Sequence, residues 1–197
     1  QYSSNSGSTW TTFTDGVSTS TSATVTGLTN GTSYIFRVAA INTWGTGSYS
    51  TSSATTNPFT TPSAPTSVAG SPSSSQVTVT WTAATANGRA VTDYIIQFSS
   101  NSGSTWSTFS DGTSTATSAT ITGLTNGVAY VFRVAATNSA GTSSYSTTSA
   151  SATPQSVPSL PTSVAGTGGN TQVSLVWTTP SSNGGRSITD YIVQFSS

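Results

Sequence analysis

The sequence predicts an all-β protein made of tandem seven-stranded antiparallel β-sandwiches, on three observations. Short runs alternate between apolar and polar residues, as from Val77 to Trp81, which is the period of a half-buried strand. Dipeptides that favour tight turns, such as Asn87-Gly88 and Asn126-Gly127, separate these runs. No segment carries a sustained apolar stripe of helical period. Short alternating strands joined by turns are typical of an antiparallel β-sandwich.

An internal repeat sets the organisation of the chain. Residues 1–10 recur as residues 97–106, an offset of 96 (97 − 1), and residues 65–70 recur at the same offset as residues 161–166. A period of this length is that of a whole domain. Within one repeat we expect strands, in order, at 65–70, 77–81, 94–98, close to Trp106, at 119–122, at 130–136 and after Gly141.

The repeat predicts one complete domain and two partial ones. We expect residues 61–157 to form the complete domain, residues 1–60 the C-terminal part of a preceding domain, and residues 158–197 the N-terminal three strands of a further one. A partial sandwich leaves an apolar face and an unpaired edge. Two explanations stay open: the chain is a window on a longer tandem array, or copies join head to tail and complete each other.

A family resemblance extends over the whole chain. It rests on residues 65–68, on Trp81 in the second run, on residues 92–98 in the third, and on residues 119–127 and 130–138. Together these residues resemble a fibronectin type III domain. It implies seven strands in two sheets and a tyrosine corner, in which a phenol oxygen bonds back to nearby backbone. The expected structural core residues are Trp81, Trp177, Tyr34, Tyr130, Leu28 and Leu124.

Charge and composition argue against several kinds of partner. Only 4% of the residues are charged, four Arg and four Asp, with a net charge of zero. Scattered Arg residues cannot supply the basic stripe that nucleic acid or an anionic membrane surface requires. The chain has no Cys, and no apolar run reaches the ~18 residues of a membrane span. We therefore expect no nucleic-acid partner and no membrane insertion.

Catalytic and metal-binding residue patterns are not found in the sequence. A serine nucleophile needs a general base, and the chain has no His, Lys or Glu. Asp15 and Asp111 precede Gly in turns, while Asp93 and Asp190 precede the Tyr of the third strand. Two isolated Asp per repeat are too few for a calcium site. We expect no enzyme activity, no cofactor and no metal.

Aromatic residues are the better candidates for contact with a ligand or a neighbour. Trp10 and Trp106 follow a Ser-rich turn and could stack on a sugar ring or on a neighbouring domain, although packing on their own sheet is the alternative. Trp44 lies in the loop where the next repeat has Ala140, and could fill a seam between domains. Arg37 and Arg133 are expected to face solvent.

We expect a non-enzymatic structural repeat of an extracellular or cell-surface filament or fibre, with an adhesive role as a further option. Its expected partner is another repeat or another copy, joined head to tail, and a glycan is the other candidate. The alternative functions are a carbohydrate-binding or spacer module of a secreted polysaccharide-degrading enzyme, and a virion fibre or decoration module.

Overall fold

The computed structural model describes residues 1–196; Ser197, the last residue of the expected C-terminal partial domain, lies outside the described residues. The chain divides into two compact units. The first contains Gln1–Ala64, Ala84–Asp93 and Ala136–Ser144. The second contains Pro65–Ala83, Tyr94–Ala135 and the chain from Tyr145 onward. The described residues form strands, turns and extended segments without a helix, so no helix among them could cross a membrane.

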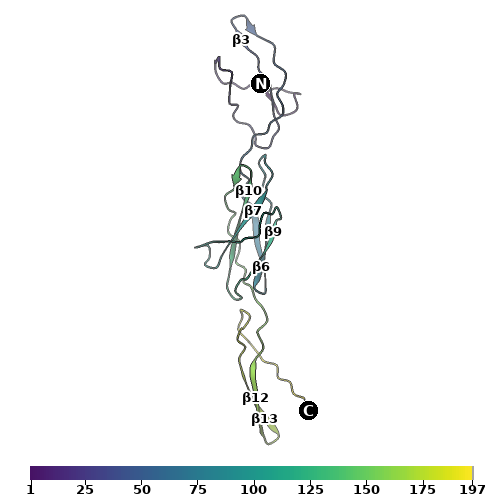
Figure 1. Cartoon of the computed structure of the whole chain (residues 1–197), viewed down its shortest axis with the longest axis vertical. Helices are drawn as coiled ribbons and strands as arrows, with labels where there is room; N and C mark the ends of the chain where they lie inside the picture. Colours follow the sequence, from purple (N-terminus) through teal and green to yellow (C-terminus); the bar gives the residue numbers. More distant parts are fainter. Residues whose placement is uncertain (197) are drawn as a thin grey trace. The chain divides into compact units, whose positions relative to one another are not determined.

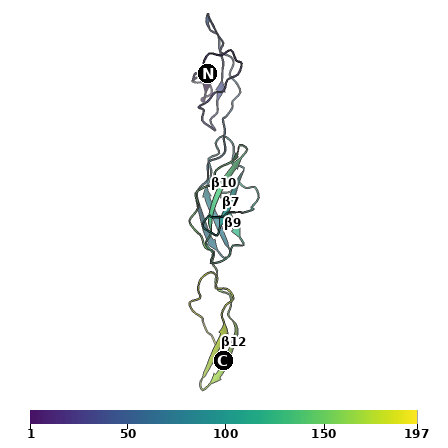
Figure 2. The same cartoon turned by 90° about the vertical axis from the view of Figure 1, so that its left-hand side faces the viewer.

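Seven strands, β5 to β11, make two antiparallel sheets, and we call this part of the chain the complete repeat. One sheet has the order β5-β6-β9 and the other the order β11-β10-β7-β8. Figure 1 shows β6, β7, β9 and β10 running alongside one another, and Figure 2 shows β7, β9 and β10 from the side. The seven strands are β5 (Thr66–Ser73), β6 (Gln76–Thr82), β7 (Asp93–Ser99), β8 (Ser107–Thr108), β9 (Ser118–Thr122), β10 (Val131–Asn138) and β11 (Gly141–Thr142). This is the predicted all-β sandwich.

The core lies between these two sheets. The alternation on β6 buries Val77, Val79 and Trp81, and the alternation on β10 buries Phe132 and Val134. Trp81 packs edge-on against Tyr94 of β7, with ring centroids 5.3 Å apart, so an aromatic contact joins the two sheets. Apolar side chains at every second position therefore supply the area removed from water that stabilises the sandwich.

The edge beside β10 is irregular, and serine hydroxyls complete its hydrogen bonds. Ser143, Ser146 and Ser149, here called the serine ladder, lie three residues apart, whereas their partners on β10 lie two residues apart. Each ladder N–H donates to a carbonyl of β10, and each ladder Oγ accepts a backbone N–H from β10. The hydroxyl satisfies the donor that the unequal spacing would otherwise leave unpaired. The high Ser content of the chain thus has a structural use at this edge.

Ser146 is the buried member of the ladder, and its replacement by Ala should be costly. Its Oγ accepts the backbone N–H of Val134 at 3.1 Å, and Val134 itself is fully buried on β10. Ser146→Ala leaves that N–H without this acceptor, and we expect the free energy of unfolding to fall by about 1–3 kcal/mol. Urea unfolding followed by circular dichroism measures the loss. The matched control is Ser144→Ala, at an exposed position of the same segment; an equal loss in both variants would contradict the proposed role of the hydroxyl.

The segments at the two ends contain fewer strands. Residues before the complete repeat form β1 (Tyr2–Ser3), β2 (Ile35–Phe36), β3 (Ile41–Asn42) and β4 (Gly45–Thr46), paired as β1-β2 and β3-β4. Residues after it form a hairpin of β12 (Thr162–Gly169) and β13 (Gln172–Thr178). The hairpin repeats the pairing of β5 with β6, including the register shift near its start.

Candidate functional site

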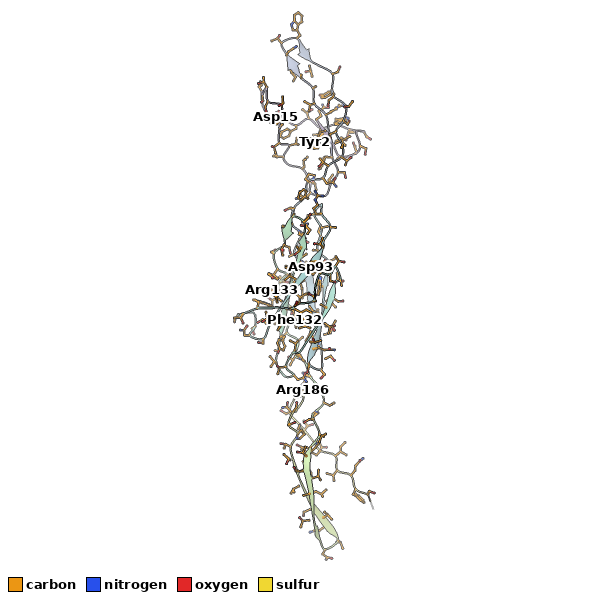
Figure 3. All side chains as sticks on the ribbon, in the orientation of Figure 1. Tyr2, Asp15, Asp93, Phe132, Arg133 and Arg186 are labelled. Atoms are coloured by element: carbon orange, nitrogen blue, oxygen red, sulfur yellow. The ribbon has the colours of Figure 1, made fainter. Side chains whose placement is uncertain are left out.

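An arginine stacked between two aromatic rings lies on the outer face of β10. The guanidinium carbon of Arg133 is 4.1 Å from the centroid of the Trp106 ring and 4.3 Å from that of Tyr145. Its Nε and Nη2 donate to Oε1 of Gln97 on the neighbouring strand β7, at 2.9 and 2.7 Å. Figure 3 labels Arg133 beside the buried Phe132, its neighbour on β10. Alternation along the strand places these two side chains in different environments.

The first repeat contains the same arrangement. The guanidinium of Arg37 lies 4.1 Å from the Trp10 ring and 4.2 Å from the Tyr49 ring. Its Nε and Nη2 donate to Oε1 of Gln1 at 2.8 and 2.6 Å. We call each set of four residues an arginine cluster. A cation stacked on an aromatic face contributes roughly 0.5–1 kcal/mol at an exposed site, and more when desolvated.

A hydrogen-bonded turn positions the tryptophan of each cluster. In the complete repeat, Ser99 Oγ accepts the backbone N–H groups of Asn101 and Gly103, and Asn101 Oδ1 accepts the N–H of Thr105 at 2.9 Å. Gly103 has a φ of +89°, and a Cβ there would come within 3.1 Å of Cζ2 of Trp106. Only glycine tolerates both conditions easily. The turn backbone therefore lies directly against the indole.

The clusters correct part of the sequence interpretation. Arg37 and Arg133 were expected to be solvated, but each is half-buried and stacked. Trp10 and Trp106 are also half-buried, and a guanidinium covers one face of each indole. The sequence analysis did not identify the other members of the clusters, because stacking and hydrogen bonding to an arginine join residues that lie far apart in the chain. These members are Tyr49, Tyr145, Gln1 and Gln97. The recurrence of all four residue types at the repeat offset was the available signal.

Trp44 lies outside the clusters, between strands β3 and β4. Its side chain is 97% exposed, and its backbone N–H donates to Asn42 Oδ1 at 2.9 Å. The equivalent turn of the complete repeat contains Ala140, whose N–H donates to Asn138 Oδ1 at 2.8 Å. The two turns therefore share a backbone arrangement and differ in the side chain that they present.

The predicted core residues differ in burial between the complete repeat and the ends of the chain. Tyr130, Leu124 and Trp81 are buried, and Tyr34 is buried as well, whereas Leu28 and Trp177 are half-buried. The Tyr130 hydroxyl accepts the N–H of Thr125 at 3.1 Å, and the Tyr34 hydroxyl accepts that of Thr29 at the same distance. Both are the back-bonded tyrosine corner that the resemblance implied.

Glycine loops meet at a joint inside the first unit. Gly31 N–H donates to Pro58 O at 2.9 Å, and Thr60 N–H donates to Asn87 O at 3.1 Å. Gly88, with a φ of +90°, lies so close that a Cβ on it would be 2.5 Å from Pro58 O and 2.9 Å from the nitrogen of Gly31. The sequence reasoning identified Asn87-Gly88 only as a turn, although the glycine also allows the close approach of two loops.

An equivalent joint lies inside the second unit. Gly127 N–H donates to Pro154 O at 2.9 Å, and Ser156 N–H donates to Gly184 O at 2.8 Å. Gly185, with a φ of +90°, lies against Gly127 as Gly88 lies against Gly31. We call these contacts the first and second joints. The donors of these bonds lie 96 residues apart in the two joints, and the acceptor loop of the second joint is shifted by one further residue because a glycine is inserted at 184–185. The joint therefore recurs with the repeat despite the insertion.

Titratable side chains are sparse around these features. In the described part of the chain, no three His, Cys, Asp or Glu side chains gather where they could hold a metal ion. Asp15 and Asp93 are labelled in Figure 3, on different segments of the chain. The functional candidates in the described residues are therefore the stacked arginines, the hydroxyl networks and the glycine joints.

The sandwich of β5 to β11 and the recurrence of its sequence and loop contacts define a repeat protein of the immunoglobulin-like sandwich class. The family model of the fibronectin type III domain matches residues 1–56 and 63–152, and the chain belongs to that family. The resemblance in sequence is therefore confirmed.

Two curated relatives match in sequence. Exoglucanase B of Cellulomonas fimi is 32% identical over 196 residues, which covers 90% of this chain and 17% of that protein. Kelch domain-containing protein SSO1033 of Saccharolobus solfataricus is 46% identical over 77 residues, which covers 39% of this chain and 10% of that protein. The chain thus spans less than a fifth of the length of either relative.

Solved structures of similar chains include domains FN1–FN3 of chicken CNTN1 and domains A168–A170 of titin. The first is 25% identical with a TM-score of 0.47, covering 78% of this chain and 55% of that one. The second is 27% identical with a TM-score of 0.45, covering 62% of this chain and 40% of that one.

Proposed function

We propose that the chain is a non-catalytic structural repeat of an extracellular or cell-surface protein, which holds successive fibronectin type III domains in series. In this proposal residues 61–157 are one complete domain, residues 1–60 are the C-terminal part of another, and residues 158–197 begin a third. The observation that carries the proposal is the joint, formed twice by closely approaching glycines and by backbone hydrogen bonds, the second time with one residue inserted in the acceptor loop. A flexible linker would not need either feature.

Amide hydrogen exchange tests this role. The joint amides of Gly31 and Thr60 in the first unit, and of Gly127 and Ser156 in the second, should exchange at least 100-fold more slowly than amides of the exposed 16–19 segment, because each joint amide donates to a backbone carbonyl of the opposing loop. Exchange at the rate of that loop would show that the joints open freely, and the structural role would then be lost.

A second candidate is a spacer within a polysaccharide-degrading enzyme, which the 32% identity to an exoglucanase favours. The arginine clusters support a spacing role over a carbohydrate-binding one, because the guanidinium covers one face of the half-buried Trp106 ring and so leaves less of the ring for stacking on a sugar. We expect the chain to remain in the supernatant when it is mixed with insoluble cellulose. Retention that disappears in Trp106→Ala would overturn this in favour of carbohydrate binding.

A further inference from the structure

One arginine lacks the glutamine acceptor that the other three arginines of the chain have. Arg37 and Arg133 each donate to a glutamine Oε1 within their arginine clusters. Arg186, labelled in Figure 3, donates from Nε to Oε1 of Gln155 at 2.7 Å. Among the described residues, none accepts a hydrogen bond from the guanidinium of Arg89. The N–H donors of Arg89 are therefore left for solvent or for a ligand.

An aromatic ring holds Arg89 where a glutamine holds Arg186. Phe59 is the repeat equivalent of Gln155 (155 − 59 = 96), and Arg89 is the counterpart of Arg186 once the inserted glycine is counted (186 − 89 = 97). The guanidinium carbon of Arg89 lies 4.2 Å from the centroid of the Phe59 ring. Stacking uses the face of the guanidinium and leaves the N–H groups at its edge free. Phenylalanine in place of glutamine thus orients the arginine without occupying its donors.

Uncharged polar groups lie around this guanidinium. A hollow on the first unit is lined by Thr55, Thr56, Asn57, Gly88 and Arg89. None of these residues is acidic, so Arg89 gives the hollow a positive charge. Threonine hydroxyls and the asparagine amide can each donate and accept hydrogen bonds. The lining therefore suits a ligand that carries both a negative charge and several hydroxyl groups.

The exposure of this arginine belongs to the joint. At the first joint the complete repeat follows in the chain, and Arg89 is exposed. At the second joint the complete repeat comes before, and Arg186 is exposed as well. Each side of the joint is thus represented once by a complete sandwich. Because the arginine is exposed in both settings, its access to a ligand does not depend on which side is complete.

We propose that Arg89 binds the carboxylate of an acidic sugar, a uronic acid residue of a polysaccharide. The planar fork of the guanidinium matches a carboxylate, with which it forms two parallel hydrogen bonds. Thr55 and Asn57 beside it bind the sugar hydroxyls. The inference goes beyond the proposed structural role and does not rest on it. It agrees with the expected release from cellulose, because cellulose carries no carboxylate.

Titration with sodium glucuronate, followed by the NMR signal of Arg89 Nε–H, tests the site in the whole chain. We expect a saturable shift that weakens as salt is added, because the charges are exposed. Glucose, acetate and sulfate should each bind roughly tenfold more weakly, since none offers a carboxylate and ring hydroxyls together. A signal that does not move with glucuronate would overturn the proposal. Acetate or sulfate binding as tightly as glucuronate would reduce the site to a contact for any anion, and would overturn the sugar assignment.

Phe59→Gln separates the free donors of Arg89 from its charge. The new glutamine should accept the Arg89 guanidinium as Gln155 accepts that of Arg186, so the charge stays while the donors are occupied. We expect glucuronate binding to weaken roughly tenfold. Arg89→Lys should weaken it by a similar factor, because an ammonium group has no planar fork. Binding that is unchanged in either variant would contradict the proposed geometry.

Arg186→Lys is the matched control, because it removes the equivalent arginine whose Nε already donates to Gln155. It should leave glucuronate binding unchanged, and an equal loss in Arg186→Lys and Arg89→Lys would show that only net charge matters, which would overturn the assigned site. Circular dichroism checks that each variant is folded. Amide exchange at Gly31 and Thr60 in Arg89→Lys should match that of the unmodified chain, so the role of the joint is judged separately from sugar binding.

Discussion

Phe132→Ala should lower the free energy of unfolding of the complete repeat by about 3–5 kcal/mol, a large part of the stability of a small domain. Phe132 is fully buried near the start of β10, so its truncation removes apolar area from the core and leaves a cavity. A Cβ built on Gly70 of β5 would lie 3.0 Å from the Phe132 ring, which shows that the ring reaches the opposite sheet. Urea unfolding monitored by circular dichroism measures the effect.

The matched control is Val131→Ala on the same strand. Val131 is half-buried on the outer side of β10, so its truncation should cost less than about 1 kcal/mol. Both variants leave every tryptophan in place, and fluorescence can therefore follow the same transition in each. Equal losses in the two variants would mean that the inner and outer faces of β10 are not distinguished by packing.

The fold could be predicted from the sequence because its determinants are local. Alternation over five to seven residues specified β6, β7 and β10, and Asn-Gly pairs specified their turns. The edge beside β10 was less predictable. A strand was expected beyond Gly141, but regular pairing ends at Thr142 and the serine ladder continues the edge with unequal spacing. That spacing depends on hydroxyl bonds to another strand, which periodicity along one segment cannot reveal.

The candidate site was less predictable than the fold. Trp10 and Trp106 were expected either to contact a sugar or a neighbouring domain or to pack on their own sheet, and the arginine on which each one stacks was not predicted. The partners of Arg133 lie at Gln97, Trp106 and Tyr145, on three other segments of the chain, so the cluster forms only when the sheet has formed. Trp44 was recognised because it breaks the repeat, a signal that needs no knowledge of the fold.

Gly88→Ala should disrupt the first joint, with a cost of about 1–3 kcal/mol from the positive φ alone and a further cost from steric overlap. The added Cβ would lie 2.5 Å from Pro58 O, 2.9 Å from the nitrogen of Gly31 and 3.1 Å from Cβ of Phe59. Two of these neighbours are backbone atoms, which cannot move aside as the end of a long side chain can. We expect the amides of Gly31 and Thr60 to exchange at least tenfold faster, while the buried amides of β10 change little.

Gly112→Ala is the control that separates backbone strain from overlap. Gly112 has a φ of +76°, and a Cβ on it would meet nothing within 4 Å. Its substitution therefore carries the conformational cost without the collision. If the joint depends on close approach, Gly88→Ala must accelerate exchange at Gly31 and Thr60 while Gly112→Ala leaves it unchanged. Unchanged exchange in both variants would show that Gly88 is needed only for the conformation of its own turn. The proposal that the first joint holds the repeats in series would then be wrong.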